Sequence, residues 1–265
     1  MDRRKTALIT GASGGIGLEL TRLLAADRHD VVIVGRDRER LEGVAADLRD
    51  RFQIAARCEA CDLCQPRTAF DLWNALTAGG IAIDILVNNA GVGMYGAVDE
   101  RDPADLDRML QLNVAVLTTL TRLALPGMRE RRWGRILNIA SVVAYQPGGP
   151  RMAAYYATKA YVLSFSRGLA RELRGTGVSV TVLSPGPTGT AFDDRAGATV
   201  DTPYKRLTKM SAAQVARAGY DGMQRQSREV IPGLTTKVLA LAGAFSPPSI
   251  GLEVNRMLWE PLRRR

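Results

Sequence analysis

Short apolar runs alternate along the chain with longer amphipathic stretches, and this alternation predicts strands and helices in turn. Several of the strands are apolar without a break, as in Val31–Val34, which is typical of strands buried on both faces. The predicted strands are Thr6–Thr10, Val31–Gly35, Ile54–Asp62, Ile83–Asn88, Arg135–Ser141, Val178–Ser184 and Glu229–Ile231. The predicted helices are Gly15–Ala26, Arg38–Arg51, Arg67–Ala78, Asp102–Glu130, Met152–Arg174 and Ser211–Arg225.

Strand and helix alternate through the whole pattern, which predicts an α/β fold with a doubly wound parallel sheet of about seven strands and helices on both faces. The sequence contains no internal repeat, low-complexity tract or linker. We therefore expect one domain over residues 1–265.

Two segments interrupt the alternation. Pro185–Lys209 is rich in Gly, Pro, Thr and Asp, and we expect a lid at about 190–225. A helical extension at about 235–265 is split into two short helices by Pro247 and Pro248, and it ends in three arginines. This extension is expected to pack on its own domain or on a second subunit. The alternative is a basic amphipathic segment that rests on a membrane surface.

Composition narrows the class of protein. With 265 residues, 46% hydrophobic and 24% charged, the chain has the composition of an ordinary globular protein, which excludes a disordered, collagenous or disulfide-stapled chain. The net charge of +9 permits acidic partners, but no nucleic-acid-reading motif accompanies it, so nucleic-acid binding is not expected. No targeting segment and no stretch of ~18 apolar residues is present, which predicts a cytoplasmic protein.

A glycine-rich loop follows the first predicted strand and opens the first predicted helix. It reads Thr-Gly-Ala-Ser-Gly-Gly-Ile-Gly over Thr10–Gly17. Glycines allow a sharp turn and close approach to a pyrophosphate, and the helix N-terminus presents free N–H groups to an anion. Taken alone, such a run is weak evidence and is more often an ordinary strand-to-helix turn. Its place in the first βα unit favours dinucleotide binding, and the absence of Gly-Lys-Ser/Thr excludes a P-loop.

A tyrosine and a lysine stand one helical turn apart. Tyr155 and Lys159 are four residues apart in a predicted helix, so their side chains share one face, whereas Tyr156 is followed at that spacing by Ala160. A tyrosine pKa lies near about 10, and a nearby ammonium stabilises the phenolate, which favours general acid/base catalysis. Ser141, at the end of the fifth predicted strand, can hydrogen-bond a substrate oxygen. Without these neighbours, the Tyr–Lys pair would read as a surface pair.

Together these features resemble the short-chain dehydrogenases/reductases in their single-domain form. The resemblance covers nearly the whole chain and rests on Thr10–Gly17, Asp62-Leu63, Asn88–Gly91, Asn113, Ser141, Tyr155–Lys159 and Pro185–Thr190. It implies a Rossmann-type fold, a nicotinamide cofactor, hydride transfer at a carbonyl or alcohol carbon, and a homodimer or homotetramer.

The resemblance also implies roles for individual residues. The implied catalytic residues are Asn113, which holds a water, Ser141, Tyr155 and Lys159. Asp62 would hold the adenine, Lys159 the nicotinamide ribose, and Thr188 and Thr190 the carboxamide. The implied cofactor-binding residues are Gly11, Ser13, Gly14, Gly15, Ile16, Gly17, Arg36, Asp62, Leu63, Asn89, Ala90, Gly91, Tyr155, Lys159, Pro185, Gly186, Thr188 and Thr190. The separation of Ser141 and Tyr155 is one residue longer than is commonest in the family, and we expect the extra residue in the loop Pro147–Pro150.

The end of the second predicted strand bears on the choice of nicotinamide cofactor. An acid there hydrogen-bonds the ribose hydroxyls of NAD, whereas an arginine pairs with the 2′-phosphate of NADP. The strand ends at Gly35 and is followed by Arg36, with Arg38 and Arg40 as possible helpers, so NADP(H) is expected rather than NAD(H). Against this, some NADP-using relatives carry a basic residue where this chain has Gly14.

The substrate is the least readable part of the site. Met94–Val98, Val142–Met152 and Thr190–Lys209 supply mainly apolar residues, which predicts an apolar pocket for a small or lipid-like ketone, aldehyde or alcohol. Two alternatives stay open: a reductase of β-ketoacyl groups on an acidic carrier protein, and a catalytically silent NADP(H)-binding regulatory protein. Cys58, Cys61 and Cys64 lack a fourth ligand, so no metal site is expected.

Overall fold

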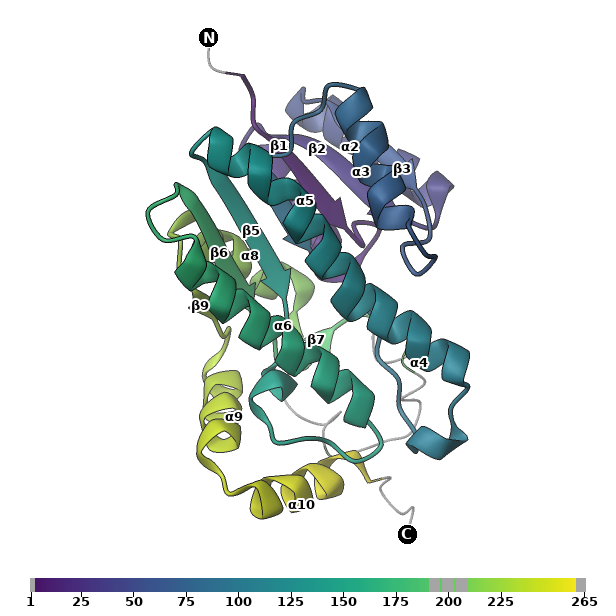
Figure 1. Cartoon of the computed structure of the whole chain (residues 1–265), viewed down its shortest axis with the longest axis vertical. Helices are drawn as coiled ribbons and strands as arrows, with labels where there is room; N and C mark the ends of the chain where they lie inside the picture. The colour runs from purple at the N-terminus through teal and green to yellow at the C-terminus, as the bar shows by residue number, and fades with distance from the viewer. Residues whose placement is uncertain (1–2, 191–195, 197–202, 204–208, 261–265) are drawn as a thin grey trace.

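The computed structural model describes residues 3–190, 196, 203 and 209–260. Seven of its strands are β1 Thr6–Thr10, β2 Asp30–Gly35, β3 Ala56–Ala60, β4 Ile85–Asn88, β5 Gly134–Ile139, β6 Val178–Leu183 and β9 Glu229–Val230. They form one parallel sheet in the order β3-β2-β1-β4-β5-β6-β9 (Figure 1). The order changes direction beside β1, which confirms the predicted doubly wound α/β fold of the Rossmann type.

Helices cover both faces of this sheet. The α-helices of the described residues are α1 Gly15–Ala26, α2 Arg38–Phe52, α3 Thr68–Ala78, α4 Pro103–Leu110, α5 Leu117–Glu130, α6 Ala153–Glu172, α8 Ala212–Gln224, α9 Leu234–Phe245 and α10 Pro248–Trp259. Apolar residues of α1, α2 and α8 pack on one face, and those of α3, α5 and α6 pack on the other. A small second sheet pairs β7 Thr188–Gly189 with β8 Met210–Ser211.

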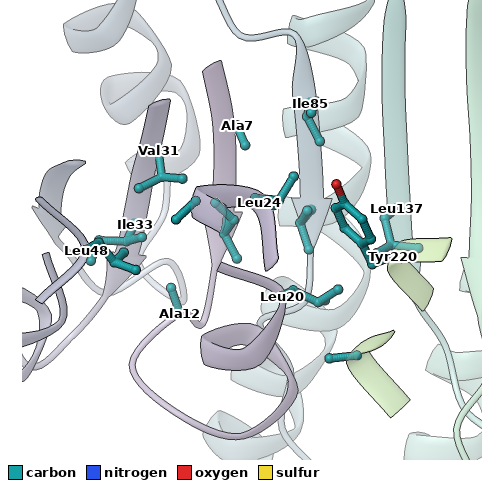
Figure 2. Packing of buried hydrophobic residues seen from close by; sticks show 14 of the residues in the cluster. Ala7, Ala12, Leu20, Leu24, Val31, Ile33, Leu48, Ile85, Leu137 and Tyr220 are labelled. Atoms are coloured by element: carbon teal, nitrogen blue, oxygen red, sulfur yellow. The ribbon is translucent and has the colours of Figure 1, made fainter. Parts of the chain in front are cut away.

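The core follows from the unbroken apolar runs. In β1, Ala7 points to the face that carries Leu20 and Leu24 of α1 (Figure 2). Ile9 belongs to the same cluster, whereas Leu8 belongs to the cluster on the opposite face. All five side chains are fully buried. Because successive strand residues alternate between faces, a strand covered on both sides needs apolar residues at every position.

Polar residues fix where several helices begin. The Asp37 side chain caps α2 by accepting a hydrogen bond from the Arg40 amide at 3.0 Å. Asp102 caps α4, which has proline at its first position. Ser211 and Gln214 form a capping box at the start of α8.

The predicted helix Asp102–Glu130 differs from the observed one in its middle. Between α4 and α5, residues Gln111–Val116 form a π-helical segment. Such segments insert an extra residue into a helix and occur frequently at functional sites. Here the segment contains Asn113, which is 2% exposed and is bonded to the loop after β4.

The C-terminal extension forms the two expected helices, and it packs on its own chain. Asn255 of α10 donates a hydrogen bond to the Gly148 carbonyl at 2.6 Å, and Trp259 is 3% exposed. Among the described residues, none of the helices has the length and apolarity that crossing a bilayer requires. Much of the expected lid, residues 191–195, 197–202 and 204–208, lies outside the described residues.

Candidate active site

Two side chains fasten the carboxyl ends of β1 and β4 together. The Thr10 hydroxyl accepts hydrogen bonds from the amides of Asn89 and Ala90, each at 3.0 Å. The side-chain amide of Asn89 donates to the carbonyls of Thr10 and Gly11 at 2.9 and 3.1 Å. The strand order reverses at this point, and doubly wound sheets bind their ligands in the crevice just beyond it. Sequence reasoning missed this structural use of the Asn89 side chain.

The glycine loop has the shape of a phosphate cradle. Gly11 and Gly15 have φ of 67° and 57°, a left-handed conformation that favours glycine. A Cβ on Gly17 would lie 2.3 Å from the Gly11 carbonyl oxygen, so only glycine lets α1 pack this closely on the loop. The N-cap of α1 is Gly14, and no side chain of the described residues caps it. The first N–H groups of the helix therefore suit an anionic ligand.

The end of β2 brings cations to this loop. Arg36 follows the strand and is exposed, and Ser13 lies close to Gly35, whose Cβ would be 3.6 Å from the Ser13 hydroxyl. Arg40 reaches back from α2, since a Cβ on Gly14 would lie 3.2 Å from its guanidinium. A cation thus stands beside position 14 although the residue there is glycine. The sequence suggested Arg40 only as a helper and did not indicate this contact.

Asp62 lies beyond the end of β3. Its carboxylate accepts hydrogen bonds from the Cys64 amide and from the Arg108 guanidinium of α4, both at 3.1 Å. Burial raises the pKa of Asp62, but these hydrogen bonds outweigh it and hold the pKa below its ordinary value. Leu63 is buried in the core beneath it. Arg108 had no signal in the sequence, because it is distant along the chain.

The cysteines around Asp62 do not converge. Cys58 packs against the core cluster on one face of the sheet, and Cys61 and Cys64 pack against the other. Burial is the largest cause that raises the pKa of both Cys58 and Cys61 to about 11. Among the described residues, no group of three His, Cys, Asp or Glu side chains could hold a metal ion.

Lys159 is buried at the centre of the candidate site. Its Nζ donates a hydrogen bond to the Ile139 carbonyl at the end of β5, at 2.9 Å, and lies 5.8 Å from the centroid of the Tyr155 ring. Gly91 lies beside the amine, since a Cβ there would be in ordinary contact with Nζ at 3.5 Å. Burial lowers the pKa of Lys159 from 10.5 to about 8. Tyr155, one turn earlier in α6, is 7% exposed.

Asn113 holds the loop after β4 against α6. Its Oδ1 accepts a hydrogen bond from the Val92 amide at 2.9 Å, and its Nδ2 donates to the Val92 carbonyl at 2.9 Å and to the Thr158 hydroxyl at 3.1 Å. The side chain of Asn113 therefore links the loop after β4 to α6. Thr158, next to Lys159, is a further residue that the sequence did not single out.

Ser141 follows β5, and the backbone of the next residue links the end of β5 to the end of β6. The Ser141 hydroxyl accepts a hydrogen bond from the Val143 amide at 3.4 Å, and the Val142 amide donates to the Pro185 carbonyl at 2.8 Å. Beyond Pro185, the Thr188 hydroxyl donates to the Gly186 carbonyl at 2.9 Å. Further on, Thr190 approaches the glycine loop, where a Cβ on Gly15 would meet its methyl group at 3.2 Å.

Trp259 forms part of the apolar wall around Tyr155. The wall is one buried cluster that includes Tyr95, Met109, Val142, Val143, Met152, Tyr155, Tyr156, Ala240 and Trp259. The Trp259 indole N–H donates to the Tyr156 hydroxyl at 2.7 Å, and the Tyr95 hydroxyl donates to the Trp259 carbonyl at 2.8 Å. These contacts join residues more than 100 positions apart in the sequence, so no local pattern predicts them.

The chain matches the short chain dehydrogenase family model over residues 5–201. It is 31% identical to an uncharacterized oxidoreductase of Staphylococcus saprophyticus, over 88% of this chain and 97% of that one. It is 34% identical to the 3-oxoacyl-acyl-carrier-protein reductase of Rickettsia felis, over 69% and 72% of the two chains.

Solved structures give the same result. A short-chain dehydrogenase from Sphingobium yanoikuyae in complex with NADPH is 34% identical, with a TM-score of 0.79 over 91% of this chain and 93% of that one. A bulky-bulky ketone specific alcohol dehydrogenase from Comamonas testosteroni is 31% identical, with a TM-score of 0.76 over 88% of both chains. The protein is therefore an oxidoreductase that belongs to the short-chain dehydrogenase/reductase family.

Proposed function

We propose that the protein interconverts a ketone or aldehyde and an alcohol with NADP(H), using Tyr155 as general acid and base. The observation that carries the proposal is the buried Lys159 amine, 5.8 Å from the Tyr155 ring, with its pKa lowered to about 8. The ammonium form of Lys159 in this place favours the phenolate of Tyr155, and this prepares the tyrosine for proton transfer. The relatives with NADPH and ketones in their names support the same reading.

The residues present fit the cofactor. The cradle of Gly11–Gly17 at the N-terminus of α1 would hold the pyrophosphate, and Asp62 would hold the adenine amino group. Arg36, with Arg40 beside Gly14, would pair with the 2′-phosphate, and this favours binding of NADP(H) over NAD(H). When bound, the cofactor supplies or accepts the hydride.

The chain's own groups handle the proton. Tyr155 gives a proton to the substrate oxygen in reduction and removes it in oxidation, and the Ser141 hydroxyl hydrogen-bonds the same oxygen. Lys159 would hold the nicotinamide ribose, and its ammonium form favours the ionised phenol of Tyr155. Asn113 holds the loop after β4 in place through its side chain, and we assign to Asn113 the water behind Lys159.

Tyr155→Phe tests this assignment. We expect NADPH affinity to stay nearly unchanged and turnover of a ketone to fall by about 10²–10⁴. NADPH binding is measured by fluorescence titration, and turnover by the loss of NADPH absorbance over a panel of ketones and aldehydes. Tyr161→Phe is the matched control, because Tyr161 lies on the outer side of the same helix and is 38% exposed. Retained turnover in Tyr155→Phe would show that another group supplies the proton.

A second candidate is the reduction of β-ketoacyl groups on an acidic carrier protein. The net charge of +9 and the relatives named as 3-oxoacyl-acyl-carrier-protein reductases favour it. For this function, we expect kcat/KM to be higher for a carrier-bound β-ketoacyl thioester than for a matched free ketone. The difference should disappear at high salt, because salt screens the attraction between the basic enzyme and the acidic carrier. Turnover of any carbonyl compound would exclude a silent regulatory protein.

A further inference from the structure

The exposed apolar side chains of this protein are concentrated on its last two helices. Among the described residues, four large exposed apolar side chains are scattered elsewhere: Phe70, Val98, Leu110 and Tyr161. The others all lie on α9 or α10: Leu234, Val238, Leu241, Phe245, Ile250, Leu252, Val254 and Met257. Isolated exposed apolar residues are normal, whereas a concentration of this kind marks an interaction surface.

The α9 residues form one stripe. Leu234, Val238, Leu241 and Phe245 follow the spacing of a single helix face, and they are 79%, 57%, 59% and 84% exposed. On α10, Ile250, Val254 and Met257 repeat the same spacing with exposures of 55%, 48% and 54%. We call these seven residues the outer face of the extension. Both helices lie at the end of the molecule opposite the N-terminus (Figure 1).

The opposite sides of the same helices are already in use. On α9, Thr236, Ala240 and Gly243 are buried, and on α10 the buried residues include Asn255 and Trp259. Ala240 and Trp259 belong to the same cluster as Tyr155. The outer face therefore stays exposed although the extension packs on its own chain with its other side. It lies on the two helices that contribute Ala240 and Trp259 to the apolar cluster around Tyr155.

The chemistry of α9 favours a lipid surface over a protein partner. After Lys237, the helix continues Val-Leu-Ala-Leu-Ala-Gly-Ala-Phe, with no polar side chain. Protein interfaces carry about one hydrogen bond per 100–200 Å², and this stretch offers no side chain to form one. A membrane interface needs no side-chain partner and attracts basic proteins when its lipids are anionic.

α10 is more mixed. Glu253, Arg256 and Glu260 form an ion-pair network along it, and Lys237 is the only charged residue between positions 231 and 252. The apolar contact should therefore be strongest along α9.

We propose that the outer face of α9 and α10 binds in the interfacial region of an anionic lipid membrane, with both helices in the membrane plane. This proposal stands apart from the reaction, because it rests on the exposed stripes and not on Tyr155 or Lys159. Where the proposed function also holds, the membrane-bound protein would meet apolar ketones in the lipid, next to the wall formed by Ala240 and Trp259.

Sedimentation with lipid vesicles tests the proposal on the full chain. We expect the protein to pellet with vesicles of phosphatidylcholine and phosphatidylglycerol, and less with phosphatidylcholine alone. Leu241→Glu combined with Phe245→Glu should lower the partition coefficient at least about tenfold, because it removes apolar contact and adds repulsion. Both side chains are largely exposed, so the fold should survive, which circular dichroism checks.

The matched control is Phe70→Glu combined with Leu110→Glu, which makes the same change of charge at exposed positions on α3 and α4. Binding driven by net charge alone would weaken equally in both double variants, and that result would overturn the proposal. Failure of the wild-type protein to pellet with either vesicle would also overturn it. A third result would also overturn it: light scattering shows that the wild type is a dimer, that Leu241→Glu combined with Phe245→Glu makes it a monomer, and no lipid binding is seen. The outer face would then be covered by a second copy of the chain. These results do not depend on turnover, so they are separate from the test of Tyr155.

Discussion

Replacing Lys159 with methionine should change the stability of the protein in a way that depends on pH. Methionine has nearly the length of lysine and no charge, so it fits the buried site without an ammonium group. In the folded protein Lys159 is 5% exposed, and burial lowers its pKa from 10.5 to about 8. The charged amine is therefore kept at neutral pH against a desolvation penalty, which we expect the methionine variant to lose.

The sign of the effect follows from proton binding. Between about pH 8 and 10.5 the unfolded chain still holds the proton that the folded chain has released, so this lysine makes the free energy of unfolding rise with pH in that window. The full lowering corresponds to about 3 kcal/mol, of which about 2–3 kcal/mol should appear between pH 6.5 and pH 10. The variant also loses the 2.9 Å hydrogen bond to the Ile139 carbonyl, which costs about 1–3 kcal/mol at every pH.

Relative to the wild type, the methionine variant should be about equally stable or somewhat more stable at pH 6.5, and less stable at pH 10. Urea unfolding of the cofactor-free proteins at the two pH values measures this, and turnover should be lost at both. Lys237→Met is the control, because Lys237 is exposed and its replacement should give the same small difference at both pH values. If the difference between wild type and Lys159→Met were also independent of pH, the amine would not be desolvated as the structure has it.

Further predictions concern the cofactor and the fold. Arg36→Asp should shift the ratio of kcat/KM values toward NADH by about ten- to a hundredfold, since a charge-assisted hydrogen bond is worth about 1.5–3 kcal/mol. Arg40→Ala should weaken NADPH binding more than NADH binding, and equal weakening in a titration would rule out its pairing with the 2′-phosphate. Asp84→Ala should lower the free energy of unfolding by about 1–3 kcal/mol in urea, because the buried carboxylate accepts hydrogen bonds from Arg3, Arg131 and the Thr6 amide.

Local patterns predicted the elements and two motifs. The unbroken apolar run of β2 and the helical spacing in α1 follow from residues that are neighbours in sequence, and so do the strand and helix that they predict. The glycine loop and the pair of Tyr155 and Lys159 could be recognised for the same reason. Their assignment to cofactor binding and catalysis stays a prediction.

Other features of the candidate site depend on distant residues. Arg40 reaches Gly14 from α2, Arg108 reaches Asp62 from α4, and Trp259 reaches Tyr156 from the last helix. The π-helical segment that contains Asn113 also lies where the predicted helix is otherwise regular. Each depends on which groups another element brings close, and a single sequence does not display this.

The sequence by itself determined the α/β class, the covered faces of the sheet and the glycine loop, because hydrophobic periodicity and glycine's backbone freedom are local properties. Only the tertiary structure decided the strand order, the desolvation of Lys159 and the contact of the C-terminal helices with the wall around Tyr155. The physical reason is that burial and electrostatics at a site are set by everything packed around it, and most of those neighbours are far away along the chain.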